Sequence, residues 1–493
     1  MKKVRGGFPV VIAVDRKAAK PLHRQIYDAF RASIVARSLN AGQQIPSSRA
    51  LAAELGVSRI PVLNSYAQLL AEGYFETRKG TGTFVSSTLP DELVPVDSRS
   101  SHAGESPLGN RRISRRSALI PRVENPQWFR GRGPFSVGQL AFDHFPFHVW
   151  SSLVARHCRS VRASSLNYGD PMGFEEFREA IAAYLRTARA VRCEASQIMV
   201  VSGSQQALEI SARALLDPGN RVWIEEPAYP LMRDALRVAG CQLVPVSVDA
   251  EGLNVAEGMR RSPKARAAYV TPSHQFPLGV TMSASRRLQL LKWAQSAQSW
   301  IVEDDYDSEY RYESMPIASL QGLDHCARVI YIGTFSKTLF PALRLGYLVI
   351  PSDLVERFAA VRRVMDIFPP HLYQAALTDF INEGHFSRHI RRTRLLYSER
   401  RRALVEAIGR EFGSISELVG GEAGMHLVLK LPDWLRDVEI SRRAADQQLW
   451  LWPLSPCYMG KESQQGFILG FASTPAAEMP RAVARLRSIL ASA

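Results

Sequence analysis

Cysteine is scarce in this sequence, and its few copies stand far apart. The 493 residues include five cysteines, with no Cys-x-x-Cys pair and no spacing typical of a metal site. They are Cys158, Cys193, Cys241, Cys326 and Cys457. Disulfide-stabilised secreted domains and cysteine-based metal centres need thiols that are closer together. The sequence therefore predicts reduced thiols, no metal centre and a cytoplasmic protein.

Long apolar runs are missing as well. No stretch reaches the roughly 18 apolar residues that a membrane-spanning helix needs. A short apolar run from Phe8 to Val14 follows a basic start, as in a signal peptide. Asp15 ends this run, and no small-residue cleavage site follows it. We therefore expect neither a membrane span nor export.

Acidic residues are fewer than basic ones, and the imbalance is uneven along the chain. The whole sequence has 62 Lys and Arg against 47 Asp and Glu, a formal charge of +15. Residues 1–86 hold 13 Lys and Arg against 5 Asp and Glu, a surplus of 8. Such a surplus is typical of proteins that bind a polyanion. The chain is also too long for one small core, so we expect two or three domains.

The basic N-terminal segment has the pattern of three helices. Apolar residues recur every four positions over residues 21–37, which indicates one buried helix face. A second helix over residues 47–56 begins at a serine cap and ends at Gly56, and a third runs from Ser58 to about residue 72. Two helices joined by a glycine turn form the helix-turn-helix arrangement, which places its second helix in the major groove of DNA.

The segment that follows, residues 73–85, predicts a β-hairpin with a basic, glycine-rich tip. Together with the three helices it resembles the GntR-type winged helix, through the phrases Pro46-Ser47-Ser48-Arg49, Leu55-Gly56-Val57-Ser58-Arg59 and Gly80-Thr81-Gly82-Thr83. We assign residues 15–86 to this DNA-binding domain. The resemblance implies that DNA is contacted by Ser48, Arg49, Ser58, Arg59, Lys79, Gly80 and Thr81. Pro61 stands where the family usually has a threonine that bonds a phosphate, so that contact is lost.

Periodicity fails between residues 87 and 125, where serine, proline, glycine and arginine accumulate, and we expect a flexible linker there. From residue 126 to residue 493 strand-like runs alternate with helical stretches. The strand-like runs lie at residues 198–201, 221–224, 242–246, 267–270, 300–302 and 329–332. This alternation predicts an α/β domain with a mostly parallel sheet, which binds ligands at the carboxyl ends of its strands.

A lysine flanked by hydroxyls follows the strand-like run at residues 329–332. A desolvated amine such as that of Lys337 becomes a nucleophile suited to Schiff-base chemistry. Thr334, Ser336 and Arg344 are donors suited to one phosphate group. The segment resembles the lysine segment of fold-type I pyridoxal 5'-phosphate (PLP) enzymes, the aminotransferase superfamily. That resemblance implies a Schiff base between Lys337 and PLP, with Thr334 and Arg344 holding the phosphate.

Further polar turns follow other strands of this domain. Ser202 to Leu208 opens a helix after a strand, an arrangement that binds anions, and the resemblance points to Gly203, Ser204 and Gln205 as phosphate ligands. It also implies that Tyr229 stacks on the pyridine ring and that Tyr306 lies near the phenolic oxygen. Asp304, with Asp305 as the competing choice, would hold the pyridinium nitrogen.

Two segments of the same domain are less direct matches. The turn at residues 271–279 stands where aminotransferases carry an asparagine that bonds the phenolic oxygen. Here His274 or Gln275 must substitute. Tyr168 resembles the tyrosine that reaches the phosphate in the neighbouring subunit, which implies a homodimer.

One chemical group of the aminotransferases is absent. They often hold the substrate carboxylate with an arginine just before a Leu-Gly-Phe strand. The corresponding strand here reads Gly466-Phe467-Ile468-Leu469-Gly470-Phe471, with isoleucine in the expected place. A carboxylate clamp of the usual kind is therefore not expected.

A winged helix joined to an aminotransferase-like domain is the architecture of the MocR subfamily of GntR regulators. The resemblance implies a cytoplasmic, homodimeric regulator that binds double-stranded DNA and PLP and senses an amine, an amino compound or PLP itself. We expect a sensor rather than an enzyme. Two alternatives stay open: a true aminotransferase with an accessory DNA-binding domain, and a DNA-binding protein whose large domain is only a dimerisation scaffold.

Overall fold

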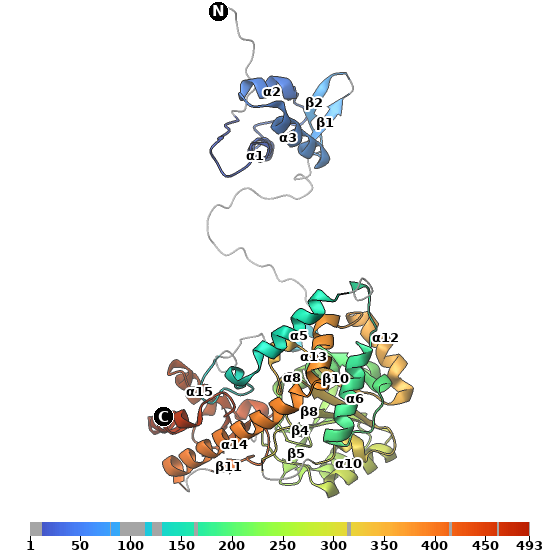
Figure 1. Cartoon of the computed structure of the whole chain (residues 1–493), viewed down its shortest axis with the longest axis vertical. Coiled ribbons are helices and arrows are strands. Elements are labelled where there is room, and N and C mark those ends of the chain that lie inside the picture. The colour runs from blue at the N-terminus through green and yellow to red at the C-terminus, as the bar shows by residue number, and fades with distance from the viewer. Residues whose placement is uncertain are drawn as a thin grey trace, which may run out of the picture. The chain divides into compact units, whose positions relative to one another are not determined.

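The computed structural model describes residues 12–78, 80–88, 114–120, 131–161, 166–312, 317–413, 417–460 and 463–492. These residues form two compact units, one over residues 12–88 and the other over residues 114–492, and each is described by itself (Figure 1). Most of the segment that we predict as a linker, residues 87–125, lies outside the described residues. Within it, the short helical turn η2 (Ser117–Leu119) lies beside helix α8 (Pro230–Val238) of the large unit.

The small unit consists of three helices followed by a hairpin. Its elements are α1 (Leu22–Val35), α2 (Ser48–Glu54), α3 (Arg59–Ala71), β1 (Phe75–Arg78) and β2 (Gly82–Val85). The two strands pair in antiparallel register, with Phe75 opposite Val85. Three helices and a hairpin in this order form the predicted winged helix-turn-helix.

Apolar residues from every element of the small unit close its core. Phe30 of α1, Tyr66 of α3 and Phe75 of β1 meet edge to face, with ring centroids 5.3–5.6 Å apart. Such aromatic pairs stabilise a small core beyond the area that they bury. The packing fixes α3 against α1 and leaves the opposite side of α3 exposed.

The large unit is built on an eight-stranded sheet. Its spatial order is β3-β10-β9-β8-β7-β4-β5-β6. The strands are β3 (Ile198–Val201), β4 (Arg221–Glu226), β5 (Gln242–Asp249), β6 (Gly252–Leu253), β7 (Ala267–Val270), β8 (Trp300–Asp305), β9 (Val329–Thr334) and β10 (Gly346–Val349). Strands β4, β5, β7, β8 and β9 run parallel, whereas β10 runs antiparallel to both of its neighbours. The predicted mostly parallel sheet is therefore present, and the carboxyl ends of its parallel strands meet at one edge.

Helices cover both faces of this sheet. Along β3, Ile198 and Val200 pack into one hydrophobic cluster, while Met199 and Val201 pack into another. A strand buried on both faces carries a continuous apolar run, which is the pattern of the sequence here. The helices besides α8 are α5 (Phe147–Arg159), α6 (Glu175–Arg189), α7 (Ser204–Leu215), α9 (Val255–Arg261), α10 (Ala284–Ser296), α11 (Leu320–Leu323), α12 (Val355–Met365), α13 (His371–Asn382), α14 (His385–Phe412), α15 (Asp437–Asp446) and α16 (Met479–Ala491).

A second, antiparallel sheet follows the long helix α14. Its order is β11-β12-β14-β13, with β11 (Leu418–Val419), β12 (His426–Lys430), β13 (Trp452–Pro453) and β14 (Gly466–Gly470). This sheet brings residues near the C-terminus next to loops of the first sheet: Phe276 packs with Trp452 and Ile468 in one cluster.

Two expectations from composition concern membrane-spanning helices and the cysteines. Among the described residues, no helix combines the length and the apolar character that crossing a membrane requires. All five cysteines lie in described segments as free thiols; Cys158 and Cys326 are exposed, and the other three are buried.

Candidate functional sites

Lys337 lies in a cavity of about 340 Å³ at the carboxyl edge of the large sheet. Strand β9 ends at Thr334, and the loop that follows carries Ser336 and Lys337 into the cavity wall. Burial lowers the pKa of the Lys337 ammonium, and the carboxylates of Asp307 and Asp304 partly offset this effect. A lysine that loses its proton more readily is a better nucleophile.

One end of the cavity has the groups of an anion site. Gly203, Ser204 and Gln205 line it at the N-terminus of α7, where backbone N–H groups lack helical partners. The guanidinium of Arg344 lies next to Gly203: a Cβ added at this glycine would be 3.5 Å from Nη1, in ordinary contact. Thr334 and Ser336 line the same region. A helix terminus, an arginine and several hydroxyls together suit a phosphate.

Strand β8 ends in three acidic residues that face two sides of the sheet. Asp305 pairs with the buried Arg189 at 2.8 Å and accepts a hydrogen bond from Tyr331 at 2.5 Å. Glu303 accepts from the backbone N–H groups of Leu320 and Gln321, each at 2.8 Å. Because side chains alternate along a strand, Asp304 faces the other way, into the cavity. Of the two predicted choices, the cavity therefore contains Asp304 and not Asp305.

Asp304 is buried, and one of its two carboxylate oxygens lacks a hydrogen-bond partner among the described residues. The Tyr269 hydroxyl donates to its Oδ2, but Oδ1 has no hydrogen-bond partner among the described residues. Burial, together with the nearby Asp305 and Asp307, raises the pKa of the Asp304 carboxyl to about 7. A buried carboxylate oxygen without a donor is costly, and a protonated ring nitrogen would supply the missing donor.

Aromatic side chains form the walls beside Asp304. Tyr229 and Tyr306 line the cavity, as the sequence predicts for residues around a ring. Phe276 packs edge to face against Tyr229, with centroids 5.4 Å apart.

The structure does not bring His274 or Gln275 into the cavity. The Gln275 amide donates to the carbonyl oxygens of Pro227 and Phe276, at 2.8 and 2.6 Å. His274 lies behind Tyr306, with Nδ1 3.0 Å from the phenol oxygen. The turn instead presents Phe276 to the cavity. The shape of this turn depends on the carbonyls that hold Gln275, which the sequence pattern does not reveal.

Tyr168 is also away from the cavity of its own chain. It is 79% exposed and packs beside Phe368, with ring centroids 5.9 Å apart. Its predicted role concerns a neighbouring subunit, so its place outside this cavity leaves that prediction untested.

Sequence reasoning missed several residues that line the cavity. Gly138 lies so close to Lys337 that a Cβ there would be 2.6 Å from Nζ. Asp307 and His426 add polar groups, and Trp452 adds an aromatic wall. Asp307 stands three residues beyond Asp304, so the acidic segment itself was a signal for it. No local pattern marks Gly138, His426 or Trp452, because distant segments bring them to the cavity.

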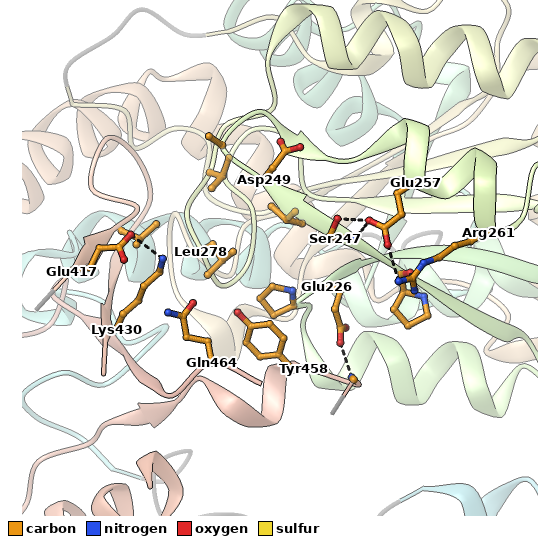
Figure 2. Close-up of a pocket in the computed structure, with 17 residues that line it drawn as sticks. Glu226, Ser247, Asp249, Glu257, Arg261, Leu278, Glu417, Lys430, Tyr458 and Gln464 are labelled. Carbon is orange, nitrogen blue, oxygen red and sulfur yellow. Dashed lines mark hydrogen bonds and ion pairs between the residues drawn. The ribbon is translucent and has the colours of Figure 1, made fainter. Parts of the chain in front are cut away.

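A larger cavity of about 760 Å³ lies between β5 and the second sheet (Figure 2). Several of its charged groups already have partners, as Figure 2 shows: Lys430 pairs with Glu417 and Arg261 with Glu257, each at 2.8 Å. Glu226 accepts a hydrogen bond from the backbone N–H of Gly460 at 2.8 Å. Glu226 also keeps an unpartnered Oε2 among the described residues. Lys430 is ion-paired, however, whereas burial lowers the pKa of Lys337, so the smaller cavity is the stronger candidate site.

The small unit exposes several of the side chains that we expect at DNA, whereas Ser48 is half-buried. Arg49 on α2 and Arg59 at the start of α3 are exposed, and Nε of Arg59 donates to Oγ of Ser48 at 3.1 Å. Ser47 caps α2 by accepting from the N–H of Ala50, which leaves Ser48 for Arg59. Ser58 precedes α3 and makes no side-chain capping bond.

The hairpin tip and the start of α3 complete this surface. Gly80 and Thr81 form the turn, where the Thr81 hydroxyl donates to the carbonyl of Arg78 at 3.1 Å. Lys79 lies outside the described residues. Pro61 occupies the first turn of α3, a position that tolerates proline.

Comparisons with known proteins match both units. Residues 22–85 match the family of bacterial regulatory proteins of the gntR type, and residues 134–486 match aminotransferase class I and II. The chain is 41% identical to the probable rhizopine catabolism regulatory protein MocR of Rhizobium meliloti, over 97% of this chain and 95% of that protein. It is 30% identical to the pyridoxine biosynthesis transcriptional regulator PdxR of Corynebacterium glutamicum, over 94% of each chain.

The large unit also has close structural counterparts. The kynurenine aminotransferase of Pyrococcus horikoshii superimposes with a TM-score of 0.72 at 26% identity, covering 78% of this chain and 99% of that one. The eight-stranded sheet with its crossing helices is therefore the fold-type I aminotransferase fold. With a GntR-type winged helix before that fold, and regulators matched over nearly the whole length, this chain belongs to the MocR subfamily of GntR-family transcription regulators.

Proposed function

We propose that this protein regulates transcription by binding DNA through the small unit and PLP through Lys337, and that an amine or amino compound alters its DNA binding. The observation that carries the proposal is the cavity itself. It combines Lys337, the unpartnered Oδ1 of Asp304, and the Arg344 guanidinium beside the start of α7. An exposed helix-turn-helix lies in the same chain.

The residues present fit PLP. Arg344, Ser204 and Thr334 would hold the phosphate, Asp304 would accept from the ring nitrogen, and Tyr229 would lie against the ring. When bound, PLP supplies an aldehyde carbon that one primary amine at a time can occupy. Lys337 is the amine that the protein itself offers.

Sensing follows from a competition between amines. With PLP bound, Lys337 would tie the loop after β9 to the cofactor, and an effector amine would compete with Lys337 for the same carbon. If the two states of this loop favour different arrangements of the protein, the effector shifts their balance by its differential binding energy. A cytoplasmic location belongs to this proposal, because the operator is chromosomal DNA.

A true aminotransferase is the second candidate, because the residues of the cavity fit the cofactor that such an enzyme uses. Against efficient turnover, Ile468 occupies the place of the usual carboxylate-binding arginine and is fully buried. The chain also matches regulators over nearly its whole length. Residual transamination is compatible with both candidates, and steady product formation from an amino donor and a keto acid would favour the enzyme.

We also propose a homodimer. Tyr168 is exposed and lies away from the cavity of its own chain, as expected for a residue that reaches the site of a second copy. Light scattering of the purified protein would show a mass of two chains. A monomer that binds PLP fully would contradict this part.

The deciding experiment is an absorbance spectrum of the purified protein with PLP. We expect a visible band that borohydride abolishes and that a Lys337→Ala variant lacks. Lys292→Ala is the matched control, because Lys292 is an exposed lysine on α10. A band in the Lys337→Ala variant equal to that of the control would refute the role of Lys337. A protein without a band would leave the large unit as a scaffold.

A further inference from the structure

Helix α3 of the small unit exposes two large apolar side chains. Among the described residues of this unit, three such side chains are exposed: Val35 on α1, and Ile60 and Leu63 on α3. Ile60 is 67% exposed and Leu63 is 42% exposed. Residues three apart on a helix are neighbours, so Ile60 and Leu63 form one apolar patch, while Val35 stands on another helix.

The packing of α3 turns this patch away from the core. The buried residues of α3 are Val62, Ser65, Tyr66 and Leu69. On the opposite side of the helix, about half a turn around its axis, the exposed residues are Ile60, Leu63, Asn64 and Ala67. None of these four carries a charge, and the sole charged residue of α3 is its first, Arg59. The outer face of α3 is therefore apolar, with one amide.

Cationic side chains stand at the start of this face rather than on it. Arg59 is exposed, and its Nε donates to Oγ of Ser48 on α2, next to the exposed Arg49. Contacts from arginines to phosphates position a protein on DNA without reading its sequence. In a helix-turn-helix, the second helix lies in the major groove and its outer side chains reach base edges. The apolar patch is thus on the surface of α3 that would meet the bases.

The chemistry of the patch distinguishes between base edges. In the major groove thymine offers a C5-methyl group, whereas the other features of the four base pairs are hydrogen-bond donors and acceptors. Ile60 and Leu63 placed against donors or acceptors would remove those groups from water without giving them a partner. Placed against methyl groups, they would bury apolar surface on both sides. The amide of the neighbouring Asn64 suits adenine, to which it can both donate and accept.

We propose that Ile60 and Leu63 contact thymine methyl groups in the major groove, and that these contacts make the protein select A·T pairs beneath α3. Asn64 adds selection for adenine. The proposal rests on DNA binding by the small unit, which is part of the proposed function, and it adds what α3 reads.

The first experiment selects binding sites for the full-length protein from a random pool of DNA duplexes. We expect thymine at fixed positions of the selected sites. Each of these thymines is then replaced by deoxyuridine, which keeps the base pair and lacks only the methyl group. Losing a contacted methyl should raise Kd about fourfold, since one buried carbon is removed. Replacing a thymine outside the selected positions should leave Kd unchanged.

Ile60→Ala and Leu63→Ala variants assign this effect to residues. Both side chains are exposed, so their truncation should leave the fold intact, which a melting curve checks. Each variant should bind the selected site more weakly and lose its sensitivity to deoxyuridine at one position, because the methyl group there has lost its partner. Val35→Ala is the matched control, since Val35 is 55% exposed on α1. It should keep the full sensitivity to deoxyuridine.

The outcomes separate this proposal from the one on which it rests. Selected sites without a fixed thymine, or thymines that deoxyuridine replaces without loss of affinity, would overturn the reading by α3 while DNA binding stands. Sensitivity to deoxyuridine that persists in both alanine variants would overturn the role of the apolar patch, and so would DNA affinity that neither variant changes. A protein that binds no duplex of the pool would overturn the DNA-binding part of the proposed function as well.

Discussion

Gly138 limits the space around the reactive lysine. A Cβ at this position would lie 2.6 Å from Nζ of Lys337, and the glycine has a φ of +77°, which other residues adopt at a cost. Gly138→Ala should therefore displace the amine and weaken PLP binding by about tenfold or more. The measurement is a PLP titration followed by the visible band.

A matched variant separates crowding from backbone strain. Gly219 has a φ of +91°, but a Cβ there would meet nothing within 4 Å. Gly219→Ala should lower the melting temperature and leave PLP affinity unchanged. If both variants bind PLP equally well, Gly138 has no special part in positioning Lys337.

Asp304 makes the stability of the cofactor-free protein depend on pH. Burial raises its pKa from the usual 3.8 to about 7, so the folded state keeps this proton to a higher pH than the unfolded chain does. Its contribution to stability is thus complete below the unfolded pKa and is lost as pH rises through the folded pKa.

An Asp304→Asn variant isolates this contribution, since the amide resembles the protonated acid. Its melting temperature without PLP should exceed that of the unchanged protein near about pH 8, and the difference should shrink toward about pH 4. Asp353→Asn, at an exposed position, serves as the control. A difference that is independent of pH, or that grows in acid, would contradict the buried state of Asp304.

At the scale of elements, helices α2 and α3 act together through one side-chain bond. Arg59 at the start of α3 donates to Ser48 on α2, which holds the exposed guanidinium between the two helices. If Arg59 neutralises one phosphate, Arg59→Ala should lower the slope of log affinity against log salt by about 1. Binding to DNA selected from a random pool, measured across a salt series, provides this slope.

Arg24 offers a contrast in the same unit. It lies on α1, 3.6 Å from Asp28, and its guanidinium stacks over Tyr27. Arg24→Ala should leave the salt slope unchanged. A slope that falls equally in both variants would indicate a general effect of charge.

Most elements that carry the site could be predicted from the sequence. The predicted strands at residues 198–201 and 267–270 coincide with β3 and β7, because buried strands carry unbroken apolar runs. Strand β8 continues to Asp305, beyond its apolar part, and its acidic end is stabilised by partners such as Arg189. A pattern of hydrophobic residues cannot show that extension.

The sequence predicts where the loops of the site lie better than it predicts which side chains of those loops line the cavity. The resemblance to aminotransferases favours Asp304 over Asp305. The alternation of side chains along β8 explains physically why Asp304 faces the cavity. The turn at residues 271–279 lies beside the cavity, and Phe276 lines the cavity while His274 and Gln275 do not. The carbonyl oxygens that hold the Gln275 amide, together with packing of Phe276 against His426 (ring centroids 5.5 Å apart), account for that arrangement.

At the scale of the whole molecule, the two compact units have separate cores. One cluster of buried residues belongs to the small unit, and the others belong to the large one. Calorimetry should therefore show two unfolding transitions. PLP at about a hundred times its Kd adds about 2.7 kcal/mol to the state that binds it, so only the transition of the large unit should move upward.

The Lys337→Ala variant tests that assignment. It should reduce the PLP-dependent shift and leave the other transition in place. A single transition that PLP moves as a whole would show that the units unfold together.

The end of strand β8 constrains how this chain can evolve. Glu303 accepts from two backbone N–H groups, Asp304 faces the cavity, and Asp305 pairs with Arg189. Each of these roles depends on which side of the sheet the residue faces. Deleting one residue earlier in the strand would place Tyr306 where Asp305 now meets Arg189, leaving a cation that is 3% exposed without its carboxylate. Substitutions along β8 are therefore more tolerable than changes in its length. Related regulators should vary in the composition of this strand but share its residue count up to the cavity.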